Sequence, residues 1–240
     1  MTISSGFSRR AFGTRLPVSA CFSVLALIAS IDSRAQVNPS GCPDLGQPFG
    51  DYLVDKDKVA LSERFHFTPE VENLVRGKSS EKIGADIDFM LSNYPNHHRA
   101  LVAMMRLGEK LKSPQPPGAR ASVECYFVLA LKFRRDDPVA RMLYANFLAR
   151  NKREVEAAAQ LELVRKAVPN DPLAQYNIGL IYLDMKNYAK ALEQAHTAQD
   201  LGVTRTDLRD QLKRAGQWKE PEPAAAPASS PQIPASGAGS

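Results

Sequence analysis

The sequence contains few of the side chains that carry out chemistry in enzymes and metal sites. Among its 240 residues are four histidines, three cysteines and one tryptophan. The only histidine cluster is His97-His98, and neighbouring residues on a helix point in different directions, so they make a poor pair of metal ligands. No nucleophile has a partner base in a recognised pattern, and no glycine-rich phosphate loop is present. We therefore expect a protein that is not an enzyme and that has no metal or cofactor.

Basic residues are concentrated in the first 35 residues rather than on one face of a domain. The formal net charge of the chain is +5, and residues 1–35 carry four arginines against Asp32, a net charge of +3. The rest of the chain therefore carries only +2. Binding to nucleic acid needs clustered Lys and Arg on one face, so we expect no nucleic-acid partner.

The sequence also lacks a hydrophobic run long enough to cross a bilayer. The apolar segment 18–31 falls short of the roughly 20 residues that a membrane helix needs. A basic start precedes this segment, and Ser33 and Ala35 supply the small residues of a cleavage site. We interpret residues 1–35 as a signal peptide that is cleaved near Ala35 and delivers the protein to the bacterial periplasm. The alternative is an uncleaved signal that tethers the protein to the membrane.

The route of export is open. The segment Ser8-Arg9-Arg10-Ala11-Phe12 resembles the core of bacterial twin-arginine signals. Gly13-Thr14 stand where that signal usually continues with Leu-Lys, so an ordinary secretory signal explains the same residues. Either route carries the protein across the cytoplasmic membrane.

Two of the three cysteines remain once the signal is removed. Cys21 lies inside the signal, which leaves Cys42 and Cys125. Exported thiols seldom stay free, so we favour a disulfide between these two residues over two unrelated thiols. In the chain-entropy model, closing so long a loop stabilises the fold by about 4–5 kcal/mol.

One short pattern occurs twice, 34 residues apart, in the second half of the chain. The matching pairs are Asp137-Pro138 and Asp171-Pro172, Ala145 and Gly179, Leu148 and Tyr182, and Ala157 and Ala191. A fixed period of this length is typical of stacked helical hairpins. Such stacks present a surface to partners and rarely carry out chemistry, so the sequence favours a binding function.

Capping residues and apolar spacing predict an all-α chain of paired helices. The expected segments are an irregular lead-in rich in Pro and Gly at 36–67, a degenerate helical hairpin at 68–97, a hairpin with an insertion at 98–137, regular hairpins at 138–171 and 172–205, a capping helix at 206–218, and a disordered Pro/Ala-rich tail at 219–240. In the degenerate hairpin, Thr68 and Gly77 are expected to bound the first helix. In the capping helix, Leu208 and Leu212 are expected to face inward, because the last hairpin of a stack otherwise leaves an apolar face in water. A spacer or cell-wall-facing linker is the alternative for the tail.

The regular hairpins resemble the tetratricopeptide repeat. In 172–205, the residues that match the family pattern are Ile178, Gly179, Tyr182, Tyr188, Ala191 and Ala198. The agreement is strong for 138–205, fair for 98–137 and weak for 68–97. The resemblance implies a right-handed stack of antiparallel hairpins, in which small residues such as Ala145 and Gly179 let neighbouring helices approach closely.

In proteins of this family, the first helices of the hairpins line a concave groove. Carried over by repeat position, that face comprises Arg99, Val102, Arg106, Val139, Met142, Asn146, Leu173, Tyr176, Asn177 and Leu180. The resemblance thus implies a groove for a peptide or partner helix, with an arginine at one end and apolar anchors toward the other. The alternative is that the lead-in or the final helix covers part of this face. Asn146 and Asn177 match the asparagines with which some members bind a terminal carboxylate, but the accompanying cations are absent, so we do not expect that mode.

These observations predict a scaffold or adaptor in the periplasm that binds a protein or peptide. The sequence does not identify the partner. The alternative is an accessory structural module of a cell-envelope enzyme or transport assembly, with the groove occupied by the chain itself.

Overall fold

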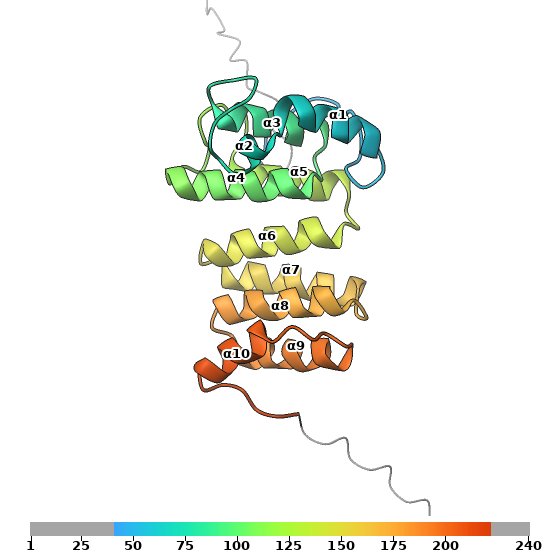
Figure 1. Cartoon of the computed structure of the whole chain (residues 1–240), viewed down its shortest axis with the longest axis vertical. Coiled ribbons are helices and arrows are strands. Elements are labelled where there is room, and N and C mark those ends of the chain that lie inside the picture. The colour runs from blue at the N-terminus through green and yellow to red at the C-terminus, as the bar shows by residue number, and fades with distance from the viewer. Residues whose placement is uncertain (1–40, 222–240) are drawn as a thin grey trace, which may run out of the picture. The chain divides into compact units, whose positions relative to one another are not determined.

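The computed structural model describes residues 41–221, and these residues contain ten α-helices (Figure 1). The helices are α1 Lys56–His66, α2 Pro69–Glu72, α3 Ile83–Asn93, α4 His98–Leu111, α5 Val123–Phe133, α6 Pro138–Arg150, α7 Glu154–Ala167, α8 Pro172–Asp184, α9 Tyr188–Asp200 and α10 Asp207–Arg214. Within the described residues, none of the helices has both the length and the apolar character needed to cross a membrane. The signal peptide expected at 1–35 and most of the expected tail lie outside the described residues.

The helices pack as consecutive antiparallel pairs, which confirms the predicted fold class. The closest pairs are α6 with α7 and α8 with α9, each joined by a short turn. We call α4, α6 and α8 the A helices and α5, α7 and α9 the B helices. Each A helix also packs on the next, α4 on α6 and α6 on α8, so the A helices lie side by side (Figure 1).

Asp-Pro pairs set the starts of the two regular A helices. The carboxylate of Asp137 accepts a hydrogen bond from the Ala140 N–H at 2.9 Å, and that of Asp171 accepts one from Ala174 at the same distance. The proline that follows each aspartate has no N–H to leave unsatisfied in the first turn. This local chemistry explains why α6 and α8 begin at the residues that the repeat pattern predicts.

A close helix contact surrounds Gly179 in α8. A Cβ added to this glycine would lie 2.5 Å from Leu208 Cδ2 of α10 and 3.2 Å from Gln194 Cβ of α9. A larger residue would overlap both neighbours, so the small residue of the repeat is required by packing. Ala145, the matching position in α6, is fully buried.

The last helix, α10, covers the end of the stack. It packs on both α8 and α9, in the same way that α8 packs on both α6 and α7. Leu208 and Leu212 are buried, as predicted, while most of the other residues of α10 are exposed or partly exposed. The chain continues past the expected start of the tail with defined contacts, since the Lys219 carbonyl lies 2.9 Å from His196 Nε2.

The prediction of an irregular lead-in over 36–67 was wrong for residues 56–66, which form α1. This helix shows no apolar stripe because it buries only Val59 and exposes Leu61 and Phe65. Its inner side is polar instead. The Ser62 hydroxyl lies 3.0 Å from the Tyr94 hydroxyl, and Glu63 accepts a hydrogen bond from His97 at 2.9 Å.

The prediction of a helix from Thr68 to Gly77 was also wrong in its length. The helix α2 ends at Glu72, and Leu74 then adopts a left-handed backbone conformation with φ of 59°. Leu74 is buried despite this conformation. The burial of the leucine side chain offsets the cost of this backbone conformation. The turn was not predicted because leucine gives no turn signal in the sequence.

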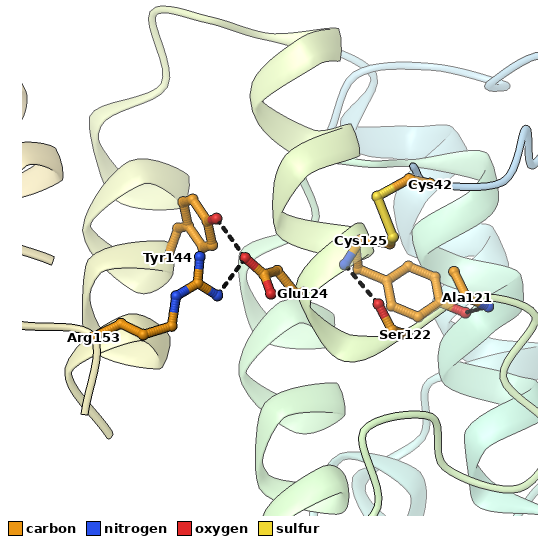
Figure 2. Close-up of a disulfide and its surroundings, with 8 residues drawn as sticks. Cys42, Ala121, Ser122, Glu124, Cys125, Tyr144 and Arg153 are labelled. Carbon is orange, nitrogen blue, oxygen red and sulfur yellow. Dashed lines mark hydrogen bonds and ion pairs between the residues drawn. A yellow bond between two sulfur atoms is a disulfide. The ribbon is translucent and has the colours of Figure 1, made fainter. Parts of the chain in front are cut away.

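A disulfide joins the lead-in to the first complete hairpin (Figure 2). Cys42 and Cys125 are bonded, with their Cα atoms 5.4 Å apart and their positions separated by 83 in the sequence. Of the two alternatives that the sequence left open for these cysteines, the structure has the bridge. Figure 2 also shows Glu124, the neighbour of Cys125, accepting hydrogen bonds from Tyr144 at 2.8 Å and Arg153 at 2.6 Å. Together these contacts connect the lead-in, α5 and the α6–α7 hairpin.

Candidate binding groove

Two adjoining hollows lie along the A helices. The hollow between α4 and α6 has a volume of about 760 Å³ and is lined by Leu74, Val102, Met105, Arg106, Glu109, Lys110, Leu143, Asn146 and Arg150. The hollow between α6 and α8 has a volume of about 560 Å³ and is lined by Glu109, Asn146, Ala149, Arg150, Lys152, Ile181 and Asp184. The two share Glu109, Asn146 and Arg150, and we call the combined surface the A-helix groove.

Three of the ten residues predicted for the groove line it, namely Val102, Arg106 and Asn146. Val139 and Leu173 are exposed at the starts of α6 and α8, outside both hollows. Met142 and Leu180 are partly buried against the core of the C-terminal hairpins, and Asn177 is also partly buried. The groove therefore follows the C-terminal halves of the A helices rather than their full length.

Arg99, predicted to be the cationic end of the groove, is already bound by the chain. Its Nε donates to Glu72 of α2 at 2.8 Å, and its Nη1 donates to Glu63 of α1 at 3.1 Å. The hydrogen bond to Glu72 is the main reason that the pKa of Arg99 is raised above its usual range. The helices α1 and α2 thus close this end of the A-helix face.

Tyr176 was predicted as an apolar anchor of the groove, and this prediction was wrong. Its ring is buried, its hydroxyl donates to Asp207 at 3.0 Å, and the Arg205 guanidinium lies 4.8 Å from the ring centroid. Burial, followed by the hydrogen bond to Asp207, raises the pKa of Tyr176. The residue belongs to the contact with the capping segment, since α10 takes the place that a further A helix would have.

Asn146 is the polar centre of the groove. It lines both hollows, and its Oδ1 atom is buried without a hydrogen-bond partner among the described residues. An unpaired buried carbonyl oxygen is costly, and a donor supplied by a ligand would satisfy it. The other side-chain atoms that share this condition are on Thr68, Gln175, Gln194 and Arg209, and none of these residues lines the groove.

Basic side chains outnumber acidic ones in the groove. Its charged lining consists of Arg106, Lys110, Arg150 and Lys152 against Glu109 and Asp184. Arg150 and Glu109 form an ion pair, and Lys110 donates to the Leu74 carbonyl at 3.0 Å. Arg106 and Lys152 form no ion pair within residues 41–221. The groove therefore combines an apolar lining with an excess of positive charge.

Three histidines lie beside carboxylates, yet none lines the groove. His66 faces Asp86 at 3.3 Å, His97 faces Glu63 at 2.9 Å and His98 faces Asp137 at 2.8 Å. In the first pair, the Ser79 hydroxyl and the Asp86 carboxylate both lie against the same ring nitrogen of His66, Nδ1. A serine–histidine–aspartate triad needs its serine and its aspartate on opposite ring nitrogens. These residues therefore form a loop contact without the geometry of a catalytic triad.

His97 has a defined tautomer. Its Nδ1 accepts a hydrogen bond from the Ala100 N–H at 3.1 Å and caps α4, so its Nε2 carries the hydrogen and donates to Glu63. Burial, together with the charge of Arg99, lowers the pKa of His97 to about 3. The ring is therefore neutral at ordinary pH and acts as a fixed link between α1 and α4.

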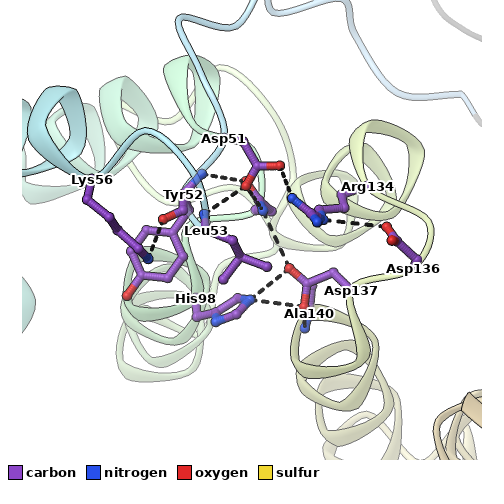
Figure 3. Close-up of polar contacts among 10 residues, drawn as sticks. Asp51, Tyr52, Leu53, Lys56, His98, Arg134, Asp136, Asp137 and Ala140 are labelled. Atoms are coloured by element: carbon purple, nitrogen blue, oxygen red, sulfur yellow. Dashed lines mark hydrogen bonds and ion pairs between the residues drawn. The ribbon is translucent and has the colours of Figure 1, made fainter. Parts of the chain in front are cut away.

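A second polar cluster fastens the residues before α1 to the starts of α4 and α6 (Figure 3). Asn96 donates to Asp51 at 2.9 Å and accepts a hydrogen bond from the Tyr52 N–H at 3.0 Å. Arg134 also binds Asp51, and His98 binds Asp137. Burial alone would raise the pKa of Asp137, but hydrogen bonds from His98 and Ala140 outweigh it and lower the pKa.

These clusters show where the lead-in lies. The contacts of Asp51, Tyr52 and Glu63 reach the N-terminal end of α4, and Asp51 also binds Arg134 at the end of α5. Tyr176 is covered from the C-terminal side by Arg205, Asp207 and Leu208. The chain thus covers both ends of the A-helix face and leaves hollows along the middle and the C-terminal halves of the helices.

Repeat spacing alone missed several residues that line the groove. Leu143, Arg150, Ile181 and Asp184 were not predicted, although Arg150 and Asp184 are themselves 34 residues apart. That spacing was the signal from which Arg150 and Asp184 could have been predicted. It could not show how far along each A helix the lead-in and α10 extend, and these two segments determine where the uncovered part of the groove begins.

Within residues 41–221, no group of three or more His, Cys, Asp or Glu side chains is placed to hold a metal ion. Comparisons with protein-family models, with curated proteins and with solved structures found no match.

Proposed function

We propose that this chain is a non-catalytic scaffold or adaptor of the tetratricopeptide-repeat type, which binds an extended peptide segment or partner helix in the A-helix groove. The observation that carries the proposal is the buried, unpaired Oδ1 of Asn146 at the point shared by both hollows. A bound peptide has regularly spaced N–H groups that could supply the missing donor. The repeat spacing and the paired helices support the family assignment.

Several features support binding rather than catalysis. Two of the histidine–carboxylate pairs hold α1 in place, the third joins the starts of α4 and α6, and no histidine lines the groove. The charged residues of the groove are arginines, lysines and two carboxylates on the A helices or in the turn after α6, an arrangement suited to recognition. We place the protein in the periplasm after cleavage near Ala35. The disulfide between Cys42 and Cys125 supports an oxidising compartment.

Selection from a random peptide library displayed on phage tests the proposal, with the full exported chain as bait. We expect the selected peptides to bind the wild-type protein, and the Asn146→Ala variant to weaken that binding about tenfold, as the loss of a buried hydrogen bond implies. Asn170→Ala is the matched control, because Asn170 is exposed in the turn before α8. Peptides whose binding is indifferent to Asn146→Ala would place the binding surface elsewhere and reject the proposal.

The second candidate is an accessory structural module of a cell-envelope enzyme or transport assembly. The observation that favours it is the coverage of Arg99 and Tyr176 by the chain's own lead-in and capping segment. In this case the surface that contacts the enzyme or assembly lies outside the groove. Selection would then yield no peptide that depends on Asn146.

A further inference from the structure

We propose that the ligand of the A-helix groove is an acidic segment of another protein, with a carboxylate that binds Arg106 and an apolar side chain that enters the hollow between Val102 and Leu143. This inference rests on the proposed function and specifies the chemistry of the partner.

The covered end of this face shows which groups it accepts. Arg99, Val102 and Arg106 lie along one side of α4 at spacings of three and four residues, so they follow one another on the helix surface. Arg99 is bound by two carboxylates, Glu63 and Glu72, that reach it from α1 and α2. The helices α1 and α2 therefore supply acidic groups to the first cation of this row. Arg106, two turns further along, is the next cation. Its charge helps to lower the pKa of Glu72, but no carboxylate in the described part of the chain forms an ion pair with it.

The hollow next to Arg106 also carries excess positive charge. Around it are three basic side chains, Arg106, Lys110 and Arg150, and one carboxylate, Glu109. Glu109 is engaged by Arg150, so it does not neutralise Arg106. A carboxylate from a ligand would form a charge-assisted hydrogen bond with the guanidinium, and Arg is well suited to such bonds.

The apolar part of the same hollow selects a second feature of the ligand. Leu74, Val102, Met105 and Leu143 line it, and Leu74 is held there by the turn that follows α2. An apolar side chain of a ligand would bury its surface among them. Asn146 lies beside this lining, and a turn of its side chain on binding would bring its buried, unpaired oxygen to a backbone N–H of the ligand. A peptide with a carboxylate close to an apolar residue meets all three requirements.

The test uses the peptides selected from the random library and their matched versions with Asn and Gln in place of Asp and Glu. We expect the selected peptides to be enriched in Asp and Glu, and Arg106→Gln to weaken their binding about tenfold. Arg106→Glu should abolish their binding. Arg64→Gln is the control, because Arg64 is exposed on α1 and forms no ion pair within residues 41–221. An unchanged thermal midpoint for each variant shows that the loss is in recognition.

The outcomes separate this inference from the proposed function. Peptides that depend on Asn146 but show no enrichment in acidic residues, or bind Arg106→Gln as tightly as wild type, would overturn the acidic partner and leave the groove function in place. Failure to select any peptide that depends on Asn146 would reject both. Equal binding of a single-stranded oligothymidylate that is also lost in Arg106→Gln would mark a general polyanion surface and contradict the peptide assignment.

Discussion

Residues 41–97 and residues 138–201 are held in place by different kinds of contact. The C-terminal hairpins bury repeated small and apolar residues, among them Ala145, Leu161 and Ala191. The N-terminal part contains a buried core too, but α1 is fixed largely by side-chain hydrogen bonds, including those of Glu63 and His97, and the segment before it by the disulfide at Cys42. The comparison shows that periodic packing can be predicted from the sequence, whereas hydrogen bonds and disulfides between distant segments cannot.

Loss of the disulfide should give the largest difference between the two regions. Replacing both Cys42 and Cys125 by serine removes a link that closes a long loop, which is worth about 4–5 kcal/mol in the chain-entropy model. Hydrogen exchange should then show faster opening of α1 to α3, while α6 to α9 keep their protection. As a control, a reducing agent should destabilise the wild type to the same degree and leave the serine variant unchanged. Equal loss of protection in both regions would mean that they open as one unit.

Overpacking at Gly179 should damage the C-terminal region selectively. Gly179→Leu places new atoms against Leu208 and Gln194, and we expect a loss of about 3 kcal/mol, the upper part of the usual range for overpacking. Thermal unfolding followed by circular dichroism measures the effect. Gly216→Leu is a poor control because φ is +68° there, so Ala159→Leu on the exposed side of α7 serves instead. A Gly179→Leu variant as stable as wild type would show that α10 is not packed at this contact.

Acidification should weaken the N-terminal region first. The pKa of His97 is about 3 in the folded state, whereas its ordinary value, which applies to the unfolded chain, is 6.5. The unfolded chain therefore takes up the proton at a higher pH than the folded chain. The contribution of His97 is therefore complete above about pH 6.5 and falls as the pH decreases from there toward 3, with about 2 kcal/mol lost by pH 5. Urea unfolding at pH 7 and pH 5 measures the loss.

His97→Asn provides the comparison for the pH effect. Asparagine can cap α4 but does not titrate, so its variant should lose less stability between pH 7 and pH 5 than the wild type. Identical pH dependence in the two proteins would assign the effect to other groups. At lower pH, protonation of Asp86 and Asp137, whose pKa values are lowered in the fold, should add to the loss in both proteins.

The smallest effect is expected at Arg99. Its ion pairs with Glu63 and Glu72 are partly exposed, with 45 % of the arginine side chain accessible to solvent. Exposed pairs contribute little, so Arg99→Met should lower the free energy of unfolding by no more than about 1 kcal/mol. Urea unfolding at neutral pH measures it, with Arg64→Met as the matched control. A loss of several kcal/mol would mean that the lead-in depends on this residue more than its exposure indicates.

The difference between the two regions also explains how far prediction from sequence reached. The hairpins expected at 138–171 and 172–205 are the pairs α6–α7 and α8–α9, because their caps and apolar residues are local signals. The helix α1 was missed because its apolar side chains Leu61 and Phe65 are exposed and its inner face is polar. In the groove, Val102, Arg106 and Asn146 followed from repeat position, whereas Arg99 and Tyr176 were assigned to the open surface and are covered by other segments.

The sequence alone determined the all-α class, the paired helices of residues 138–201 and the inward side of α10, since each depends on spacing between residues that are close in the chain. Only the tertiary structure decided that Cys42 meets Cys125, that Glu63 and Glu72 bind Arg99, and that Asp207 covers Tyr176. These contacts join residues that are about 30 to 80 positions apart and recur with no period. Their free energy depends on how whole helices pack against one another, and this packing cannot be predicted from the spacing of residues that are close in the sequence.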